Sequence, residues 1–199
     1  MAKREEKKAL SRAKLLESAA KCFADDGYDG CSVADIAKAA GMSAGNLYIH
    51  FSGKEDLFKT MIQQEHGEAA EKMRQAAGEN PSLQFIMDSL HRCIRDVGYP
   101  VEHRLWTEIL AVSARNEDIR EAFLASDKIM RDAFVDLLQK AAERGEVDDA
   151  LDFEAVSIWI YALVDGLIAR VADDADFDWE KHVETFDQLV LRALGAALK

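Results

Sequence analysis

The sequence predicts an all-α protein made of a small helical head and a larger helical body. Apolar residues recur at spacings of three and four along most of the chain, as on one face of an amphipathic helix. The 199 residues include only two prolines and are rich in alanine, leucine, glutamate and lysine, which favour helices. Turn-forming clusters, such as GENPS at 78–82, divide the pattern into segments of helical length.

The segment 32–51, SVADIAKAAGMSAGNLYIHF, predicts two short helices joined by a tight turn. We expect Ser32 to cap the first helix, Gly41 to end it and Ser43 to cap the second. Leu47 then falls on the face that meets the alanines of the first helix. Two helices in this arrangement form a helix-turn-helix, in which the second helix enters the major groove of DNA.

Longer helices are expected on both sides of this motif. One runs from about Ala9 to Asp26, and a loop from Asp25 to Cys31 follows it, because glycine and aspartate are concentrated there. The helix that begins at Lys54 joins the head to the body. That helix is expected to span 54–77. The remaining helices are expected at 82–97, 101–114, 116–144, 152–171 and 179–198.

The run 35–58, DIAKAAGMSAGNLYIHFSGKEDLF, follows a segment ending in FADDGYDGCS and resembles the signature of the tetracycline-repressor (TetR) family of bacterial transcription regulators. The resemblance spans many fixed positions from about Leu15 to Phe58 and is diffuse afterwards. It implies a homodimer with a DNA-binding head, residues 1–53, and a body, residues 54–199, that binds a small molecule and releases the operator. The DNA-binding residues that it implies are Ser32, Ser43, Ala44, Gly45, Asn46, Tyr48, His50 and, in a phosphate-contacting position, Lys54.

These side chains indicate how the DNA would be read. Asn46 can pair with adenine through both atoms of its amide, and Ala44 can contact a thymine methyl group. Gly45 allows close approach of the backbone, and because long polar side chains are few, DNA shape should contribute to specificity. Tyr48 and His50 are expected to donate to phosphates, with a half-buried packing role as the alternative for Tyr48.

The charge of the chain is unevenly distributed. The whole chain carries a formal charge of −12, which argues against DNA binding if it is taken alone. Residues 1–21, however, contain seven lysines and arginines against three glutamates. A basic arm on an acidic body can turn one face towards DNA while the body repels it, although a solvated, frayed terminus is the alternative.

The body is expected to bind a small molecule and to form the dimer. Large apolar side chains in its middle helices predict a cavity for a largely apolar molecule, with the acidic surroundings favouring a cation. We expect this cavity to be lined by Phe85, Trp106, Ile109, Met130 and Phe134. In the family that the head resembles, the last two helices form a two-fold interface, here predicted to use Val156, Ile160, Leu163, Leu167, Phe186, Val190 and Leu194. A single monomeric core is the alternative.

Other classes of protein are less favoured by the sequence. The three cysteines are widely spaced and form no CxxC pair, so we expect inert thiols, no disulfide framework and no metal site, with redox sensing as the alternative. No apolar run approaches the length of a membrane span, and a cytoplasmic protein without a membrane partner is expected. No catalytic motif or cofactor motif is present, so the sequence favours a repressor with a small-molecule effector over a DNA-binding factor without an inducer or a helical enzyme.

Overall fold

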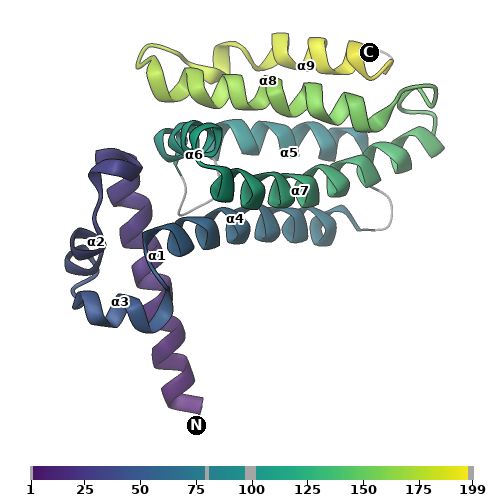
Figure 1. Ribbon diagram of the computed structural model, residues 1–199. Coiled ribbons are helices and arrows are strands. Elements are labelled where there is room, and N and C mark those ends of the chain that lie inside the picture. The colour runs from purple at the N-terminus through teal and green to yellow at the C-terminus, as the bar shows by residue number, and fades with distance from the viewer. Residues whose placement is uncertain (1, 79–80, 97–101, 197–199) are drawn as a thin grey trace. The chain divides into compact units, whose positions relative to one another are not determined.

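The computed structural model describes residues 2–78, 81–96 and 102–196, and in these ranges the chain is helical with no strand (Figure 1). This confirms the predicted all-α class. The elements are α1 (Ala2–Gly30), α2 (Val33–Ala39), α3 (Ala44–His50), α4 (Lys54–Ala77), α5 (Leu83–Asp96), α6 (His103–Arg115), α7 (Glu117–Glu143), α8 (Phe153–Asp173), the 3-10 turn η1 (Trp179–Lys181) and α9 (Val183–Ala193).

Packing divides the chain into two compact units. The first unit consists of Met1–Glu65 and Tyr99–Leu124, and the second unit of His66–Gly98 and Ala125–Lys199. The first unit therefore contains α6 as well as the helix-turn-helix, because α6 packs against α1. This division by packing differs from the expected division at residue 53, since α4 and α7 each run from one unit into the other.

Most helix boundaries agree with those expected, because short-range capping determines them. The side chain of Asp152 accepts a hydrogen bond from the Ala155 backbone at the start of α8, and Asn116 does the same for Ile119 in α7. After the end of α7, Gly145 adopts a left-handed φ of 71°, which terminates the helix. The expected helix ends at Val97 and Val101, and the middle of the GENPS cluster, lie outside the described residues.

Two helices differ from expectation. The first helix is longer than predicted. It has a kink at Gly27, where φ is 74° and ψ is 168°, and helical structure resumes after it. The expected loop is therefore largely a helical turn. The last predicted helix is divided: the 3-10 turn η1 comes first, and α9 ends at Ala193, before Gly195 with a φ of 64°. In both places a glycine adopts a backbone conformation that periodicity alone does not reveal.

Each unit has its own apolar core. In the first unit, Phe23 and Phe58 are fully buried and pack edge to face, with ring centroids 5.0 Å apart. In the second unit, α5 packs against α8, and Phe134 of α7 meets Tyr161 of α8 edge to face at 5.4 Å. These cores hold the exposed faces described below in fixed positions within each unit.

Among the described residues, α8 is long and apolar enough to cross a membrane by length and composition alone. The sequence expectation concerned uninterrupted apolar runs and is not contradicted, because α8 carries isolated charges such as Asp165 and Arg170 within its 21 residues. Only 22% of its apolar window is buried within the chain, because one apolar side of α8 is exposed.

Candidate DNA interface and regulatory sites

The first helix of the motif is held by a capping box. The Ser32 hydroxyl accepts a hydrogen bond from the Asp35 backbone N–H at 3.2 Å, and the Asp35 carboxylate accepts one from the Ser32 backbone N–H at 3.1 Å. The Ser32 hydroxyl also donates to that carboxylate. These hydrogen bonds hold the pKa of Asp35 below its usual range. The structure thus confirms Ser32 as a cap, and its hydroxyl is already engaged within the protein.

The turn and the second helix also form as predicted. Gly41 has a φ of 68°, and the backbone N–H of Met42 donates to the carbonyl of Ala37 at 2.8 Å, which closes α2. Ser43 then caps α3 by accepting from the Asn46 backbone N–H at 3.3 Å. Leu47 is fully buried where α3 meets α2. The outer face of α3 is therefore presented by a rigid, locally determined turn.

The outer face of α3 is exposed. Ser43 and Gly45 lie at its start, and Tyr48 and Ile49 follow with 58% and 68% of their surface accessible. A side chain at position 45 would meet only the Ser43 hydroxyl, at 3.8 Å, so the face is open there. The sequence analysis did not select Ile49, because only the structure shows that this large apolar side chain is exposed beside the expected contact positions.

Asn46 and His50 of α3 are both half-buried. The Asn46 Oδ1 and the His50 Nδ1 are buried without a hydrogen-bond partner in the protein. Burial, followed by the nearby charges of Lys8 and Arg12, lowers the pKa of His50. The Arg12 guanidinium also lies 5.1 Å from the centre of the Phe51 ring. The basic part of α1 therefore lies beside the end of α3 within the first unit.

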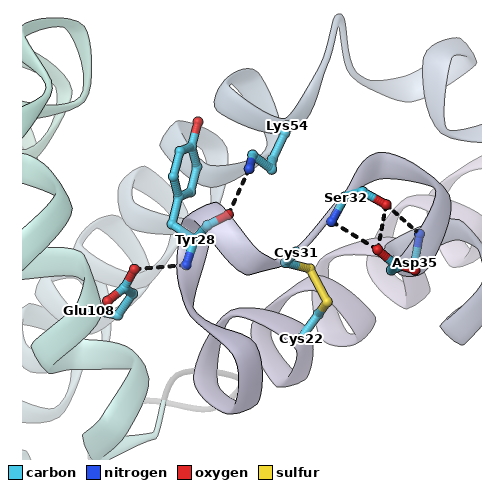
Figure 2. The surroundings of a disulfide bond; sticks show 7 residues. All are labelled: Cys22, Tyr28, Cys31, Ser32, Asp35, Lys54 and Glu108. Atoms are coloured by element: carbon cyan, nitrogen blue, oxygen red, sulfur yellow. Dashed lines mark hydrogen bonds between the residues drawn. A yellow bond between two sulfur atoms is a disulfide. The ribbon is translucent and has the colours of Figure 1, made fainter.

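Lys54, the expected phosphate contact, has partners inside the protein. Its ammonium donates to the Tyr28 backbone carbonyl at 2.7 Å and lies 4.2 Å from the centre of the Tyr28 ring (Figure 2). The backbone N–H of Tyr28 donates in turn to Glu108 Oε1 of α6 at 2.7 Å. Burial, followed by the charges of Glu55 and Asp29, raises the pKa of Tyr28. The turn after Gly27 thus joins α1, α4 and α6 in one network.

A disulfide bond joins Cys22 of α1 to Cys31, the residue before the cap of α2 (Figure 2). The Cα atoms are 6.0 Å apart, which lies in the usual range for such bonds. This corrects the expectation of three inert thiols. A spacing of nine residues carries no pairing signal in a sequence, and the kink at Gly27 is what turns the chain back to bring the sulfurs together. Cys93 is not disulfide-bonded.

The five residues predicted to line a ligand cavity are distributed over both units. Trp106 and Ile109 belong to the first unit, where the Trp106 ring lies 6.2 Å from that of Phe123. The other three belong to the second unit; Phe85 is half-buried, and Met130 and Phe134 are buried. Whether these five line one cavity stays a prediction.

Polar groups that the sequence did not single out gather beside Phe134 in the second unit. The hydroxyl of Tyr161 is buried and has no hydrogen-bond partner in the protein. Burial, followed by the nearby Cys93, Asp127 and Asp165, raises the pKa of Tyr161 well above its usual value. Asp127 is paired with Arg131 at 2.8 Å, so the group contains a matched ion pair.

His66 of α4 lies in the same surroundings, because the charge of Asp127 acts on the pKa of His66. Burial lowers the pKa of His66 to about 4, against the smaller opposing effect of Asp127. The imidazole is therefore neutral at pH 7. Within the described residues the second unit thus places a neutral histidine, an ion pair and a phenol without a partner close to an apolar core.

The residues predicted for the dimer interface do not share one exposed face. Ile160, Phe186, Val190 and Leu194 are buried within the chain itself, because α8 and α9 turn these side chains inwards. Leu163 is exposed, and Val156 and Leu167 are partly exposed. The large apolar residues that α8 and α9 expose are Ile158, Trp159, Leu189 and, of the predicted set, Leu163. Helix periodicity predicted the two helices but not which of their apolar sides is buried within the chain.

The comparison with protein families decides the family of the chain. Residues 15–61 match the family described as bacterial regulatory proteins, tetR family. Residues 87–195, more than half of the chain, match the C-terminal part of BetI-type transcriptional repressors. The protein belongs to the TetR family. It is therefore a helix-turn-helix transcriptional regulator, as the resemblance of the head implied.

Individual relatives agree with the membership of the TetR family. The transcriptional repressor AcnR of Corynebacterium diphtheriae is 27% identical over 174 residues, covering 85% of each chain. GusR of Salmonella enterica has the same fold, with a TM-score of 0.79, 25% identity and coverage of 94% of this chain and 96% of that one. FadR of Bacillus subtilis in complex with stearoyl-CoA has a TM-score of 0.69 at 20% identity, covering 89% and 96%.

Proposed function

We propose that this TetR-family regulator is a cytoplasmic homodimeric repressor that binds a near-palindromic operator through α3 and leaves it when a small, largely apolar molecule binds. The observation that carries the DNA-binding part is the exposed outer face of α3, from Ser43 to Ile49, with Arg12 and Lys8 beside its end. That combination supplies base-edge contacts and phosphate neutralisation on one side of the first unit. Relatives such as AcnR are repressors, which supports repression rather than activation of transcription.

Base recognition is proposed to centre on Asn46, with Tyr48 and Ile49 completing the contact face. The buried Oδ1 of Asn46 must turn outward before the amide can contact adenine with both atoms, and its lack of a partner in the free protein makes that rotation inexpensive. Lys54 is better suited to positioning the Tyr28 turn than to binding phosphate directly, because its ammonium already has a carbonyl partner.

Dimerisation is proposed to use the exposed apolar stripe of α8 and α9. Trp159 has 76% and Leu189 54% of its surface accessible in the single chain, which is unusual for side chains of this size. Ala162 and Gly166 lie on the same exposed side of α8, and a side chain at position 166 would meet nothing within 4 Å, so a partner helix can approach closely there. A two-fold interface would hold two copies of α3 for successive turns of DNA.

The effector is proposed to bind in the second unit beside Tyr161. Phe85, Met130 and Phe134 supply apolar surface there, and the Tyr161 hydroxyl supplies an unused hydrogen-bonding group. The FadR structure with stearoyl-CoA supports an effector with a long apolar portion, and lipophilic cations remain candidates because the chain is acidic. The second candidate function is a DNA-binding factor of the same fold that has no inducer.

The experiment that tests this proposal is selection of DNA by the purified full-length protein from fragments of its own genome. We expect a near-palindrome whose half-sites lie about one helical turn, or a modest multiple, apart. A variant with Tyr48→Ala and Ile49→Ala, which changes only exposed side chains, should fold normally and lose the selection. Recovery of no preferred sequence by the wild type, or an unchanged selection by the variant, contradicts the proposal. Retained operator binding in the presence of every compound in a library of acyl thioesters and lipophilic cations would favour the inducer-free alternative.

A further inference from the structure

From the placement of the disulfide we infer that Cys22 and Cys31 are an oxidative modification site, and that the oxidised head binds the operator more tightly than the dithiol head. The reagent is a two-electron oxidant, either a peroxide or a low-molecular-weight disulfide. This inference goes beyond the proposed function, and its statement about operator affinity rests on that function.

The two cysteines differ in access. Cys22 is half-buried on α1, whereas Cys31 has 1% of its surface accessible. The Cys22 sulfur is therefore the one that an oxidant in solution reaches first. Cys31 follows at bonding distance within the same turn, as the resolving partner. The third cysteine, Cys93, lies in the second unit and serves as an internal control.

The chemistry balances with either oxidant. With a peroxide, the Cys22 thiolate attacks the O–O bond and forms a sulfenic acid while hydroxide leaves; the Cys31 thiol then displaces water from that sulfur. Hydrogen peroxide and two thiols thus give one disulfide and two waters. With a small disulfide, the Cys22 thiolate forms a mixed disulfide and releases one small thiol, and Cys31 releases the second. Two electrons leave the protein in both cases.

The bond restrains the segment that connects α1 to the DNA-reading motif. It closes the turn that contains Gly27 and Tyr28, whose backbone holds Lys54 of α4 and Glu108 of α6 (Figure 2). Cys31 is also directly followed by Ser32, the residue that caps α2. Oxidation therefore fixes both the end of α1 and the start of α2, and α2 packs against α3.

This restraint has a predictable effect on DNA binding. In the dithiol form the segment between the cysteines has more conformations, and some of that freedom must be lost when the head docks on the groove. In the oxidised form the loss has already occurred on bond formation, so the head is pre-organised. The effect on α3 passes through the cap and the packing of α2 and needs no contact between the cysteines and DNA.

The test uses the full-length protein equilibrated with reduced and oxidised glutathione, or treated with hydrogen peroxide, followed by thiol trapping and mass spectrometry. Affinity for the genomically selected duplex is measured by fluorescence anisotropy in each state. We expect a reversible Cys22–Cys31 bond and affinity about three- to tenfold higher in the oxidised protein, the range expected from ordering one short segment beforehand. The two oxidants are compared at equal oxidising equivalents to identify which reacts faster.

Variants make the result specific. Cys22→Ser and, as a second check on folding, Cys22→Ala should bind with the lower affinity and should not respond to either oxidant. Cys93→Ser should respond like the wild type. Persistent thiols under both oxidants, or a bond that leaves affinity unchanged, overturns the inference.

A readout without DNA separates this inference from the proposed function. Amide hydrogen exchange in α2 and α3 should slow on oxidation of the wild type and stay constant in Cys22→Ser. If no operator is found, the proposed function fails. Hydrogen exchange in α2 and α3 still shows whether the disulfide restrains the head. Equal exchange in the two redox states would overturn the inference.

Discussion

Asn46 is the residue whose environment in the free protein bears most directly on DNA recognition. Its Oδ1 is buried without a partner, so the free protein gains little from the inward conformation. We expect Asn46→Ala to fold normally and to lose about 1–3 kcal/mol of discrimination against operators altered at one adenine. Competition binding with matched and altered duplexes measures this. Gln139→Ala, which removes an exposed amide from α7, is the control, and equal discrimination in both variants would show that Asn46 does not read a base.

Tyr161 provides a second prediction at this scale. A buried hydroxyl without a partner costs about 1–3 kcal/mol of desolvation, so Tyr161→Phe should leave the free energy of unfolding unchanged or raise it. Urea unfolding measures the change, with Tyr48→Phe as the control at an exposed phenol. The same variant should weaken effector binding, because the ligand loses its hydrogen bond. Clear destabilisation by Tyr161→Phe would indicate that the hydroxyl already has a partner in the folded protein.

His66 links stability to pH. Burial lowers its pKa in the folded state to about 4 from 6.5, so between these values the unfolded chain binds more protons than the folded one. Stability due to His66 is therefore complete above pH 6.5 and falls as pH falls towards 4, by roughly 3 kcal/mol in total. We expect wild type to lose that much more stability than His66→Gln between pH 7 and pH 4 in urea titrations. His182→Gln, at an exposed position, should follow the wild type, and parallel profiles for all three proteins would contradict the assignment.

At the scale of elements, α8 has one buried and one exposed apolar side. Ile160 faces the core of the second unit, and Trp159 faces outward. Trp159→Glu should leave the protomer folded and convert a dimer to a monomer in sedimentation, because the charge would enter the proposed interface. Ile129→Glu, at another exposed apolar position of the second unit, is the matched control and should remain dimeric. A Trp159→Glu protein that sediments as a dimer would place the interface elsewhere.

Local sequence signals were sufficient to predict most helices, but not to predict which face of each helix is buried. Ser32, Ser43 and Asp152 act on backbone groups three residues away, so a cap and the helix that follows it can be recognised from neighbouring letters. The inward side of α9 is different. Val190 could serve a core or a partner equally well by periodicity, and only tertiary packing shows that it is buried.

The whole molecule adds contacts between residues that are distant in sequence. Tyr28 and Glu108 are 80 positions apart, and Lys54 meets Tyr28 over 26 positions, so no local pattern predicts the network around the disulfide. The family resemblance correctly identified the regulator class from the head. It could not assign Lys54 its internal partners or pair Cys22 with Cys31, because these depend on how this chain turns at Gly27.

The proposed coupling between effector binding and operator binding is a property of the whole molecule, and thermodynamic linkage makes it testable. If an effector weakens operator binding about 100-fold, operator must weaken effector binding by the same factor, near 2.7 kcal/mol. We expect compounds from the acyl thioester and lipophilic cation library that stabilise the free protein to bind it about 100-fold more tightly than the operator complex, as measured by calorimetry. Tyr161→Phe should keep operator affinity while losing effector binding, which separates ligand recognition from DNA recognition. A compound that binds the free protein and the complex with equal affinity cannot release the operator, whatever its affinity.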